Sequence, residues 1–338
     1  MMDLNTLWFL LIVVLFTGFF FLEGFDYGVG ALTPFLSPHD RDRSIFLRTI
    51  TPVWDGNEVW MITAGGALFA AFPHVYSTMF ATFYLALFLM LFALILRGVA
   101  FDFRARYDAP CWRHGWEAAI AFGSVVPAFL WGVAITNLIA GIAINEKMIY
   151  TGGFFDLLTP YTVVGGMTFL FVFLFHGASF LSFRVVDFGL VRRAQQLGIK
   201  LGTIAALLFV LCMAMTLQYT DLFHSTLAAV ALIAAAVIFV IGIASLAKGN
   251  GKPAFVCSSL AIVLTTVAFF AGLFPRLMVS SLNPAWSLTI TNASSTPYTL
   301  SVMTVAACIF VPIVLIYQCW SYYIFRKRIT EKDAEEHY

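Results

Sequence analysis

Charged residues are scarce in this chain of 338 residues: Asp, Glu, Lys and Arg together make up 11% of it, against about 25% in an ordinary soluble domain. Hydrophobic residues make up 61% of the chain. Charge-free runs of about twenty residues or more recur along the sequence, and about 20 apolar residues of helix cross a bilayer core. The composition therefore excludes a soluble globule and predicts an all-α integral membrane protein.

The low net charge and the lack of paired cysteines argue against two further kinds of function, nucleic-acid binding and metal or disulfide chemistry. The formal net charge is +1, which gives no reason to expect a nucleic-acid partner. The 5 cysteines are scattered without a C-x-x-C spacing, so the sequence predicts no metal site and no exchangeable disulfide. We expect these cysteines to pack as small apolar residues.

Dividing the apolar runs predicts nine transmembrane helices in a single polytopic membrane domain, 1–338. Phe72-Pro73-His74 interrupts the run 59–96, which indicates two helices joined by a tight hairpin. The stretch 280–297 is rich in hydroxyls, amides and prolines, so we expect a loop there, followed by one helix. The predicted spans are 5–26, 54–72, 76–96, 117–140, 158–182, 200–219, 223–246, 253–275 and 299–325.

The basic residues predict the orientation, because Lys and Arg accumulate in short cytoplasmic loops. With the N-terminus outside, nine spans place all 19 Lys and Arg residues inside except Lys147 and Arg276. Eight or ten spans would put several basic loops on the wrong side. The sequence thus favours nine spans, N-out and C-in.

The rare carboxylates gather at the cytoplasmic end of the first three predicted spans. Each of two pairs lies one helical turn apart, the first at the end of span one and the second at the start of span two, and Arg97 closes span three. Keeping an acid at the edge of the apolar layer costs about 2 kcal/mol or more, and such acids commonly line an ion or proton route. The alternative is a set of helix-end charges that pair with Arg97 or Arg48 and face interfacial water. The candidates are Glu23, Asp26, Asp55, Glu58, Arg97 and Asp102.

Glycines accompany these acids. Gly24, Gly28 and Gly30 flank Asp26, and three more glycines follow Asp55 in the second span, at positions 56, 65 and 66. Residues without side chains let helix backbones approach closely in a bilayer. Close packing of helices alone would explain such glycines. Only their position beside the acids suggests that these helices form a functional site.

Several long strings resemble subunit II of the cytochrome bd-type quinol oxidases. They are GFDYGVG at 24–30, PVWDGNEVW at 52–60, TAGGALFAAFP at 63–73, the stretch from Arg97 to Asp102, YTGGFF at 150–155, and 287–312 with its NASS at 292–295. The resemblance covers nearly the whole chain, although 185–252 matches only in hydropathy.

The resemblance implies a multi-pass subunit of a bacterial cytoplasmic-membrane complex that oxidises quinol and reduces dioxygen to water in aerobic respiration. It implies a fold of two four-helix bundles plus one peripheral helix. Two haem b groups and one haem d would belong to subunit I, so this chain would be its non-haem partner, with no catalytic, cofactor-binding or metal-binding residue of its own. Small accessory single-span subunits, and a lipid or quinone, are further expected partners.

The resemblance also implies that this chain supplies an assembly interface and part of a cytoplasmic proton-uptake path in an electrogenic, proton-consuming enzyme. It supports Asp26, Asp55 and Asp102 residue by residue, whereas Glu23 and Glu58 depend mainly on their helix faces. Arg97 depends on its proximity to these residues along the chain as well as on the resemblance. We expect Asp55 to form the mouth of the path. The alternatives are a secondary transporter that uses the same acids, and a purely structural membrane subunit.

The positions of the histidines agree with the expectation that the haems belong to subunit I. Haem b needs an axial His or Met with a counterpart at the same depth on a facing helix. Only His176 lies well inside a predicted span and no second His shares its depth, so we expect it to be hydrogen-bonded to a neighbour or a partner. His74 with His224 is a less favoured pair near the outer surface.

Overall fold

The computed structural model describes residues 3–330, which form long helices and one small sheet. The α-helices are α1 (Leu4–Leu36), α2 (Asp40–Arg48), α3 (Trp54–Ala71), α4 (Pro73–Thr82), α5 (Tyr84–Arg104), α6 (Pro110–Ala140), α7 (Pro160–Arg184), α8 (Phe188–Tyr219), α9 (Thr226–Ala247), α10 (Gly251–Leu273) and α11 (Pro297–Ile324). The 3₁₀ helices are η1 (Phe154–Leu157), η2 (Leu222–His224) and η3 (Pro284–Trp286), and the strands β1 (Arg276–Met278) and β2 (Leu288–Thr289) pair antiparallel.

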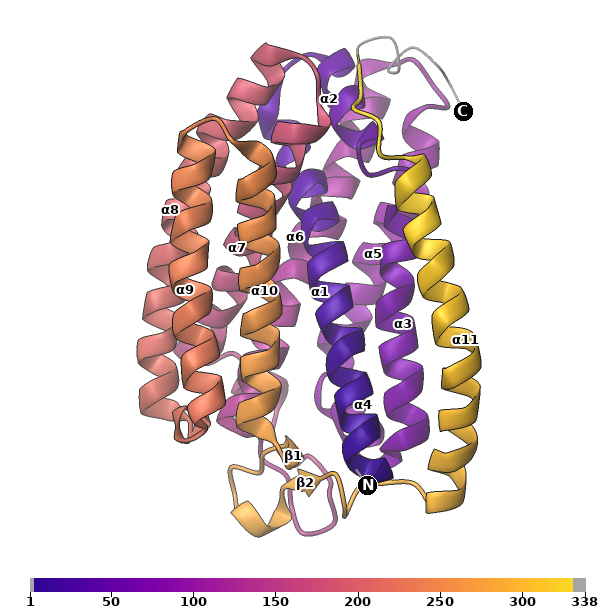
Figure 1. Cartoon of the computed structure of the whole chain (residues 1–338), viewed down its shortest axis with the longest axis vertical. Coiled ribbons are helices and arrows are strands. Elements are labelled where there is room, and N and C mark those ends of the chain that lie inside the picture. The colour runs from indigo at the N-terminus through magenta and orange to yellow at the C-terminus, as the bar shows by residue number, and fades with distance from the viewer. Residues whose placement is uncertain (1–2, 331–338) are drawn as a thin grey trace.

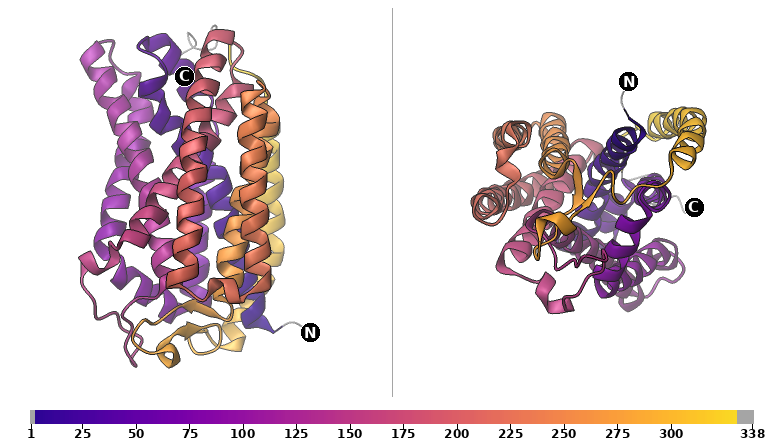
Figure 2. Two further views of the ribbon diagram at one scale, coloured as in Figure 1. Left: turned by 90° about the vertical axis from the view of Figure 1, so that its left-hand side faces the viewer. Right: turned by 90° about the horizontal axis from the view of Figure 1, so that it is seen from below.

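The long helices run side by side along the molecule (Figure 1). Helix α2 lies at one end, here called the α2 end, and β1, β2 and the start of α1 lie at the other, here called the β end (Figure 1). Seen along the helices, α11 lies at one edge of the molecule and α8 and α9 lie at the opposite edge (Figure 2). Lys332 and His337, for which the sequence predicts a cytoplasmic position, lie outside the described residues.

Eight helices within residues 3–330 are long and apolar enough to cross a membrane. They are α1, α5, α6, α7, α8, α9, α10 and α11. The segment predicted as the second span is the helix α3, which runs beside α1 (Figure 1) but is not among the eight. Its first turns contain Asp55, Asn57 and Glu58, which lower its hydropathy. Length and composition therefore identify eight candidate spans among the described residues, and they leave the predicted ninth span, α3, unconfirmed.

Several predicted boundaries were wrong because a helix does not end where its apolar run ends. Helix α1 continues to Leu36, ten residues past the predicted end at 26. Its backbone packs closely on α7 there, since a Cβ on Gly28 would lie 2.8 Å from the backbone nitrogen of Gly177. The predicted span 76–96 is divided at Phe83 between α4 and α5, and α5 continues to Arg104.

Proline marks the beginning of several helices. Helices α4, α6, α7 and α11 each begin with proline, which suits a first helical position because its missing N–H needs no partner there. Helix α3 ends at Ala71 and α4 begins at Pro73, so the predicted break at Phe72-Pro73 is confirmed. At α7, the Thr159 hydroxyl also accepts a hydrogen bond from the backbone N–H of Thr162, at 3.2 Å.

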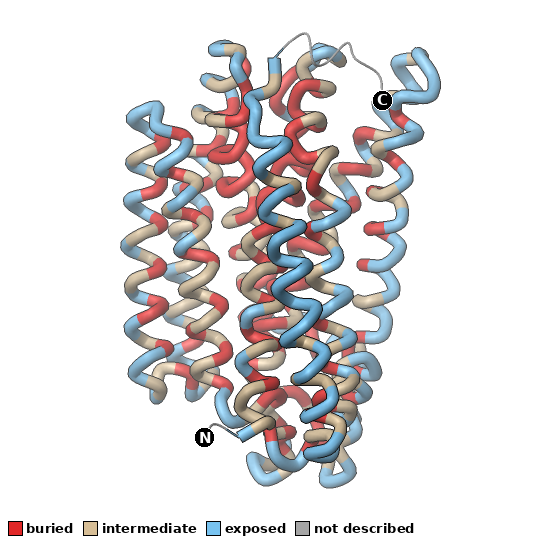
Figure 3. The backbone as a smooth tube through the Cα atoms, turned by 45° about the vertical axis from the view of Figure 1, so that its right-hand side comes forward, coloured by how far each residue is buried: buried red, intermediate tan, exposed pale blue. Residues whose placement is uncertain are grey.

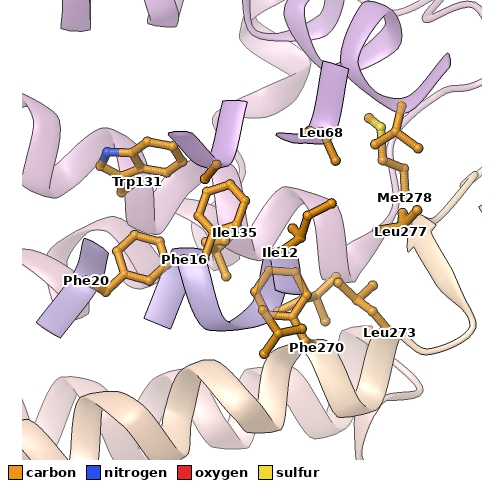
Figure 4. Close-up of a cluster of buried hydrophobic side chains, with 14 of the residues drawn as sticks. Ile12, Phe16, Phe20, Leu68, Trp131, Ile135, Phe270, Leu273, Leu277 and Met278 are labelled. Carbon is orange, nitrogen blue, oxygen red and sulfur yellow. The ribbon is translucent and has the colours of Figure 1, made fainter. Parts of the chain in front are cut away.

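Aromatic side chains dominate the core between α1, α6 and α10 (Figure 4). The ring of Trp131 lies 5.9 Å from that of Phe16 and 5.6 Å from that of Phe20, edge to face in both cases. Phe270 packs on Phe16 from α10, with ring centroids 5.9 Å apart. Ring contacts of this kind bury large apolar areas and favour particular geometries, so they set the spacing of the three helices.

Helix α11 is the least embedded of the eight apolar helices. Only 6% of an 18-residue apolar stretch of it is buried inside the described part of the chain (Figure 3). The polar stretch before it forms the predicted loop, with η3 and β2 inside it. Ser295 ties this loop to the end of α3, because its N–H donates to the carbonyl of Ala71 at 2.8 Å. The prediction of one loop followed by one helix is confirmed.

Candidate functional site

Arg97 of α5 lies at the centre of a buried ionic group near the α2 end. Its Nη1 donates to Glu23 Oε1 of α1 and to Glu58 Oε1 of α3, at 2.6 Å in each case. The side chains of Arg97 and Glu23 are 0% exposed and that of Glu58 is 17% exposed. One guanidinium therefore joins three helices, and two carboxylates share one positive charge.

Aromatic rings enclose the same guanidinium. The Cζ atom of Arg97 lies 5.0 Å from the centroid of the Tyr27 ring and 5.7 Å from those of Trp54 and Phe101. Arginine is attracted to the negative face of an aromatic ring at such distances. These rings keep water away from the ion pairs, so their charges interact strongly.

Asp26 takes part in a second polar group, centred on Asn57. The Asn57 amide nitrogen donates to Asp26 Oδ2 at 2.5 Å. Its amide oxygen accepts from the Tyr322 hydroxyl at 2.8 Å and from the Gln318 amide at 3.2 Å. Asp26 and Asn57 are both fully buried, so this amide joins α1, α3 and α11 through hydrogen bonds.

The two polar groups are adjacent because Asn57 and Glu58 follow one another on α3 and Glu23 and Asp26 lie one turn apart on α1. Several buried polar atoms in them have no hydrogen-bond partner among the described residues. These atoms are Glu23 Oε2, Asp26 Oδ1, Tyr27 Oη, Arg97 Nε and Arg97 Nη2. The site therefore retains donors and acceptors for further hydrogen bonds.

The remaining two predicted residues lie outside the buried groups. Asp55, in the first turn of α3, and Asp102, near the end of α5, are both exposed. Asp55 lies one helical turn before Glu58 on α3. The structure thus buries Glu23, Asp26 and Arg97, half-buries Glu58, and leaves Asp55 and Asp102 on the surface.

Sequence reasoning missed Asn57, although it lies inside the string PVWDGNEVW. An amide in a predicted span is a usable signal, because a polar side chain in an apolar helix needs a partner. Sequence reasoning also missed Glu117 of α6, which is 3% exposed and accepts from Arg43 and Arg104. This third group ties α2, α5 and α6 together at the α2 end.

His176 does not fit an axial haem ligand, because both of its ring nitrogens are already engaged. Its Nδ1 lies 2.7 Å from the Ser258 hydroxyl and its Nε2 lies 3.2 Å from the carbonyl of Phe21. The ring also stacks on Phe255, with centroids 4.5 Å apart. The expectation that His176 is hydrogen-bonded to neighbours is confirmed.

A family model described as cytochrome bd terminal oxidase subunit II matches residues 4–325. The chain is 39% identical to cytochrome bd ubiquinol oxidase subunit 2 of Bacillus subtilis, covering 98% of this chain and 99% of that one. It is 36% identical to cytochrome bd-I ubiquinol oxidase subunit 2 of Escherichia coli K12, covering 98% and 97%.

A solved structure shows the same fold. A chain of the bd oxidase from Geobacillus thermodenitrificans matches with a TM-score of 0.74 at 17% identity, covering 96% of this chain and 100% of that one. The resemblance of the sequence strings to this family is thereby confirmed. The chain is a multi-pass bacterial membrane protein and belongs to the cytochrome bd terminal oxidase subunit II family.

Proposed function

We propose that this chain is the non-haem subunit of a quinol oxidase that reduces dioxygen to water, and that it supplies part of the proton-uptake path and a helix interface to subunit I. The observation that carries the proposal is the buried group of Glu23, Glu58 and Arg97 beside Asp26. Its relatives are named as ubiquinol oxidase subunits, which supports quinol as the reductant.

Reduction of dioxygen to water consumes protons, and an oxygen-reducing haem within the bilayer cannot collect them through hydrocarbon. A series of titratable side chains and waters is needed. The proposed path begins at the exposed Asp55 and Asp102, continues to the half-buried Glu58, and reaches the buried Glu23 and Asp26.

The arrangement suits proton transfer in two respects. Arg97 binds Glu23 and Glu58 through the same nitrogen, so protonation of one carboxylate strengthens the hold of Arg97 on the other. The oxygens of Glu23 and Asp26 that lack a partner among the described residues provide acceptors through which a proton can pass onward.

The open face of α3 supports the proposed interface with subunit I. A Cβ placed on Gly56, Gly65 or Gly66 would meet nothing within 4 Å among the described residues, so these glycines do not serve packing inside that part of the chain. On the same helix Ile62 and Phe69 are exposed. Small residues on an apolar helix face allow a second helix to approach closely.

The haems of the complex, two of b type and one of d type, are assigned by this proposal to subunit I. The engaged nitrogens of His176 support that assignment. The proposed complex also admits small accessory single-span subunits, as well as a bound lipid or quinone.

The proposal retains nine spans with the N-terminus outside and the C-terminus inside. Helix α3 is then the additional span, and its Glu58 and Asn57 are compensated by partners on α1, α5 and α11. The α2 end is cytoplasmic in this arrangement. Lys147 and Arg276, the two basic residues predicted outside, lie instead at the β end, before η1 and in β1.

Purification of the chain from native membranes with its partner tests the proposal. We expect a haem-bearing subunit I to co-purify and the complex to show haem absorption bands and quinol-driven oxygen consumption. A complex without haem bands would favour the transporter instead. A haem-bearing complex whose turnover is insensitive to the acids would favour a purely structural subunit.

A further inference from the structure

Two apolar cavities, each of about 60 Å³, lie inside the bundle. The first, here called the α8–α9 cavity, is lined by side chains of α1, α6, α7, α8, α9 and α10, among them Ala235. The second, here called the α3–α5 cavity, is lined by side chains of α1, α3, α4, α5, α6 and α10, among them Ala134. Neither cavity shares a lining residue with the groups around Arg97 and Asn57, so both are separate from the proposed proton path.

The two cavities meet at a cluster of three aromatic rings (Figure 4). Phe20 lines the α8–α9 cavity, whereas Phe16 and Trp131 line the α3–α5 cavity. The ring of Trp131 lies 5.6 Å from that of Phe20 and 5.9 Å from that of Phe16. The rings of Phe16 and Phe20 are 6.0 Å apart. The cavities are therefore neighbours across this cluster of rings.

The linings do not suit water, because a water molecule in a cavity needs several polar partners. Among the described residues that line the α3–α5 cavity, Trp131 alone has a nitrogen or oxygen atom in its side chain. In the α8–α9 cavity, four threonine hydroxyls donate to carbonyls one turn earlier in their own helices, so their protons are already engaged. These residues are Thr136, Thr168, Thr216 and Thr266. Both cavities therefore suit an apolar molecule.

The volume of each cavity limits the occupant to a small molecule. A dry apolar cavity of about 150 Å³ binds benzene or xenon, whereas about 10–15 Å³ is enough for one water. At about 60 Å³, each cavity is too small for benzene and large enough for a diatomic gas. A small apolar gas is thus the class of ligand that fits.

The cavities connect two different sides of the chain. Helices α8 and α9 lie at the outer edge of the molecule (Figure 2), where Leu211 and Ile233 are exposed beside residues that line the α8–α9 cavity. Leu68, which lines the α3–α5 cavity, belongs to α3, the helix whose open face is proposed to contact subunit I. The pair of cavities therefore leads from an apolar outer edge toward the proposed interface.

We propose that the two cavities bind dioxygen and pass it across this chain from the bilayer to subunit I. The inference rests on the proposed function, since it takes dioxygen as the substrate of the complex. Dioxygen is apolar, so its transfer from water into hydrocarbon is favourable and the bilayer supplies it to the α8–α9 edge. Core side chains change rotamer, and such movements of the Phe16 and Phe20 rings would let the gas pass between the cavities.

The first test determines the structure of the complex under xenon pressure, with xenon as the probe. We expect xenon in both cavities. Ala235→Leu should fill the α8–α9 cavity and lose the xenon there while retaining the other, and Ala134→Leu should have the reverse effect. Ala235→Val is a smaller change that serves if the leucine variant does not assemble. Ala244→Leu, at an exposed position of the same helix as Ala235, should retain xenon in both cavities.

The second test measures oxygen consumption at different dioxygen concentrations. Ala235→Leu should raise the KM for dioxygen by about threefold or more and leave kcat and haem content unchanged, whereas Ala244→Leu should change none of these. The proposal would be overturned if the unaltered complex held no xenon in either cavity, or if ordered water filled them. It would equally be overturned if an Ala235 variant without xenon in the α8–α9 cavity kept the KM of the unaltered complex. Failure of the proposed function is distinguishable, because it would appear as missing haem bands or oxygen consumption, whereas xenon binding needs no turnover.

Discussion

The amide nitrogen of Asn57 donates to the carboxylate of Asp26 at 2.5 Å, and both side chains are fully buried. Because the Asn57 oxygen also accepts from Tyr322 and Gln318, one amide on α3 sets the position of an acid on α1 and of the helix α11. The acid proposed to carry protons is thus held by a residue that does not titrate.

Replacing Asn57 with Leu should destabilise the complex, since Asp26 loses its donor and Tyr322 loses its acceptor. Each buried polar group left unpaired costs about 1–3 kcal/mol. We expect a lower thermal midpoint and slower oxygen consumption per haem. Asn137→Leu is the matched control: Asn137 is a buried amide of α6 that donates to Val133 and Leu157, so its loss should lower stability and leave turnover per haem unchanged. Equal turnover in the two variants would contradict a role for Asn57 in positioning Asp26.

Replacing Arg97 with Gln should prevent assembly, because Glu23 and Glu58 then lose their shared cation. Breaking a buried ion pair by removing one partner costs about 3–5 kcal/mol. The yield of haem-containing complex after purification measures this effect. The double variant Arg97→Gln with Glu23→Gln removes the excess negative charge and should recover part of the yield. A single variant that assembles normally would show that the ion pairs are dispensable for folding.

Replacing His176 with Ala should leave every haem absorption band in place. The side chain bonds to Ser258 and to the carbonyl of Phe21, so the yield should fall through lost packing between α1, α7 and α10. Ser258→Ala provides the comparison, with a smaller loss of yield. Selective disappearance of one haem band in the His176 variant would mean that this chain does ligate iron.

The chain expressed without its partner should be unstable. Its outer surface includes exposed apolar residues and three glycines of α3 with open space around them in the described part of the chain, which suits contact with another subunit. We expect aggregation or rapid degradation in detergent, measured by size-exclusion chromatography. A monodisperse and thermally stable monomer would contradict an obligate partner.

The sequence allowed the prediction of most long helices because a charge-free run of bilayer length has few alternatives. It did not allow their true ends to be found: α8 begins at Phe188, well before the predicted start at 200, since its first turns contain Arg192 and Arg193 beyond the apolar run. The same reasoning counted α3 as a span, although its polar first turns keep it outside the helices that qualify by composition.

The sequence allowed us to predict which charged residues gather at the candidate site, but not which of them bond to one another. Helical spacing placed Glu23 with Asp26 on one face, and both are buried as partners of Arg97 and Asn57. Which acid would be buried could not be predicted, because Asp55 and Glu58 share one helix turn and only Glu58 faces Arg97. That difference arises from how α3 packs on α1 and α5, which periodicity does not reveal.

The most direct test of the proposed proton path is quinol-driven oxygen consumption and proton uptake by the Asp55→Asn complex. Asparagine retains the shape of aspartate and cannot titrate, so turnover should fall by about tenfold or more at unchanged haem content. Asp108→Asn, an exposed acid at the same end that pairs with Arg113, should turn over normally. Full turnover of an Asp55→Asn complex with normal haem content would contradict the path and favour a purely structural subunit.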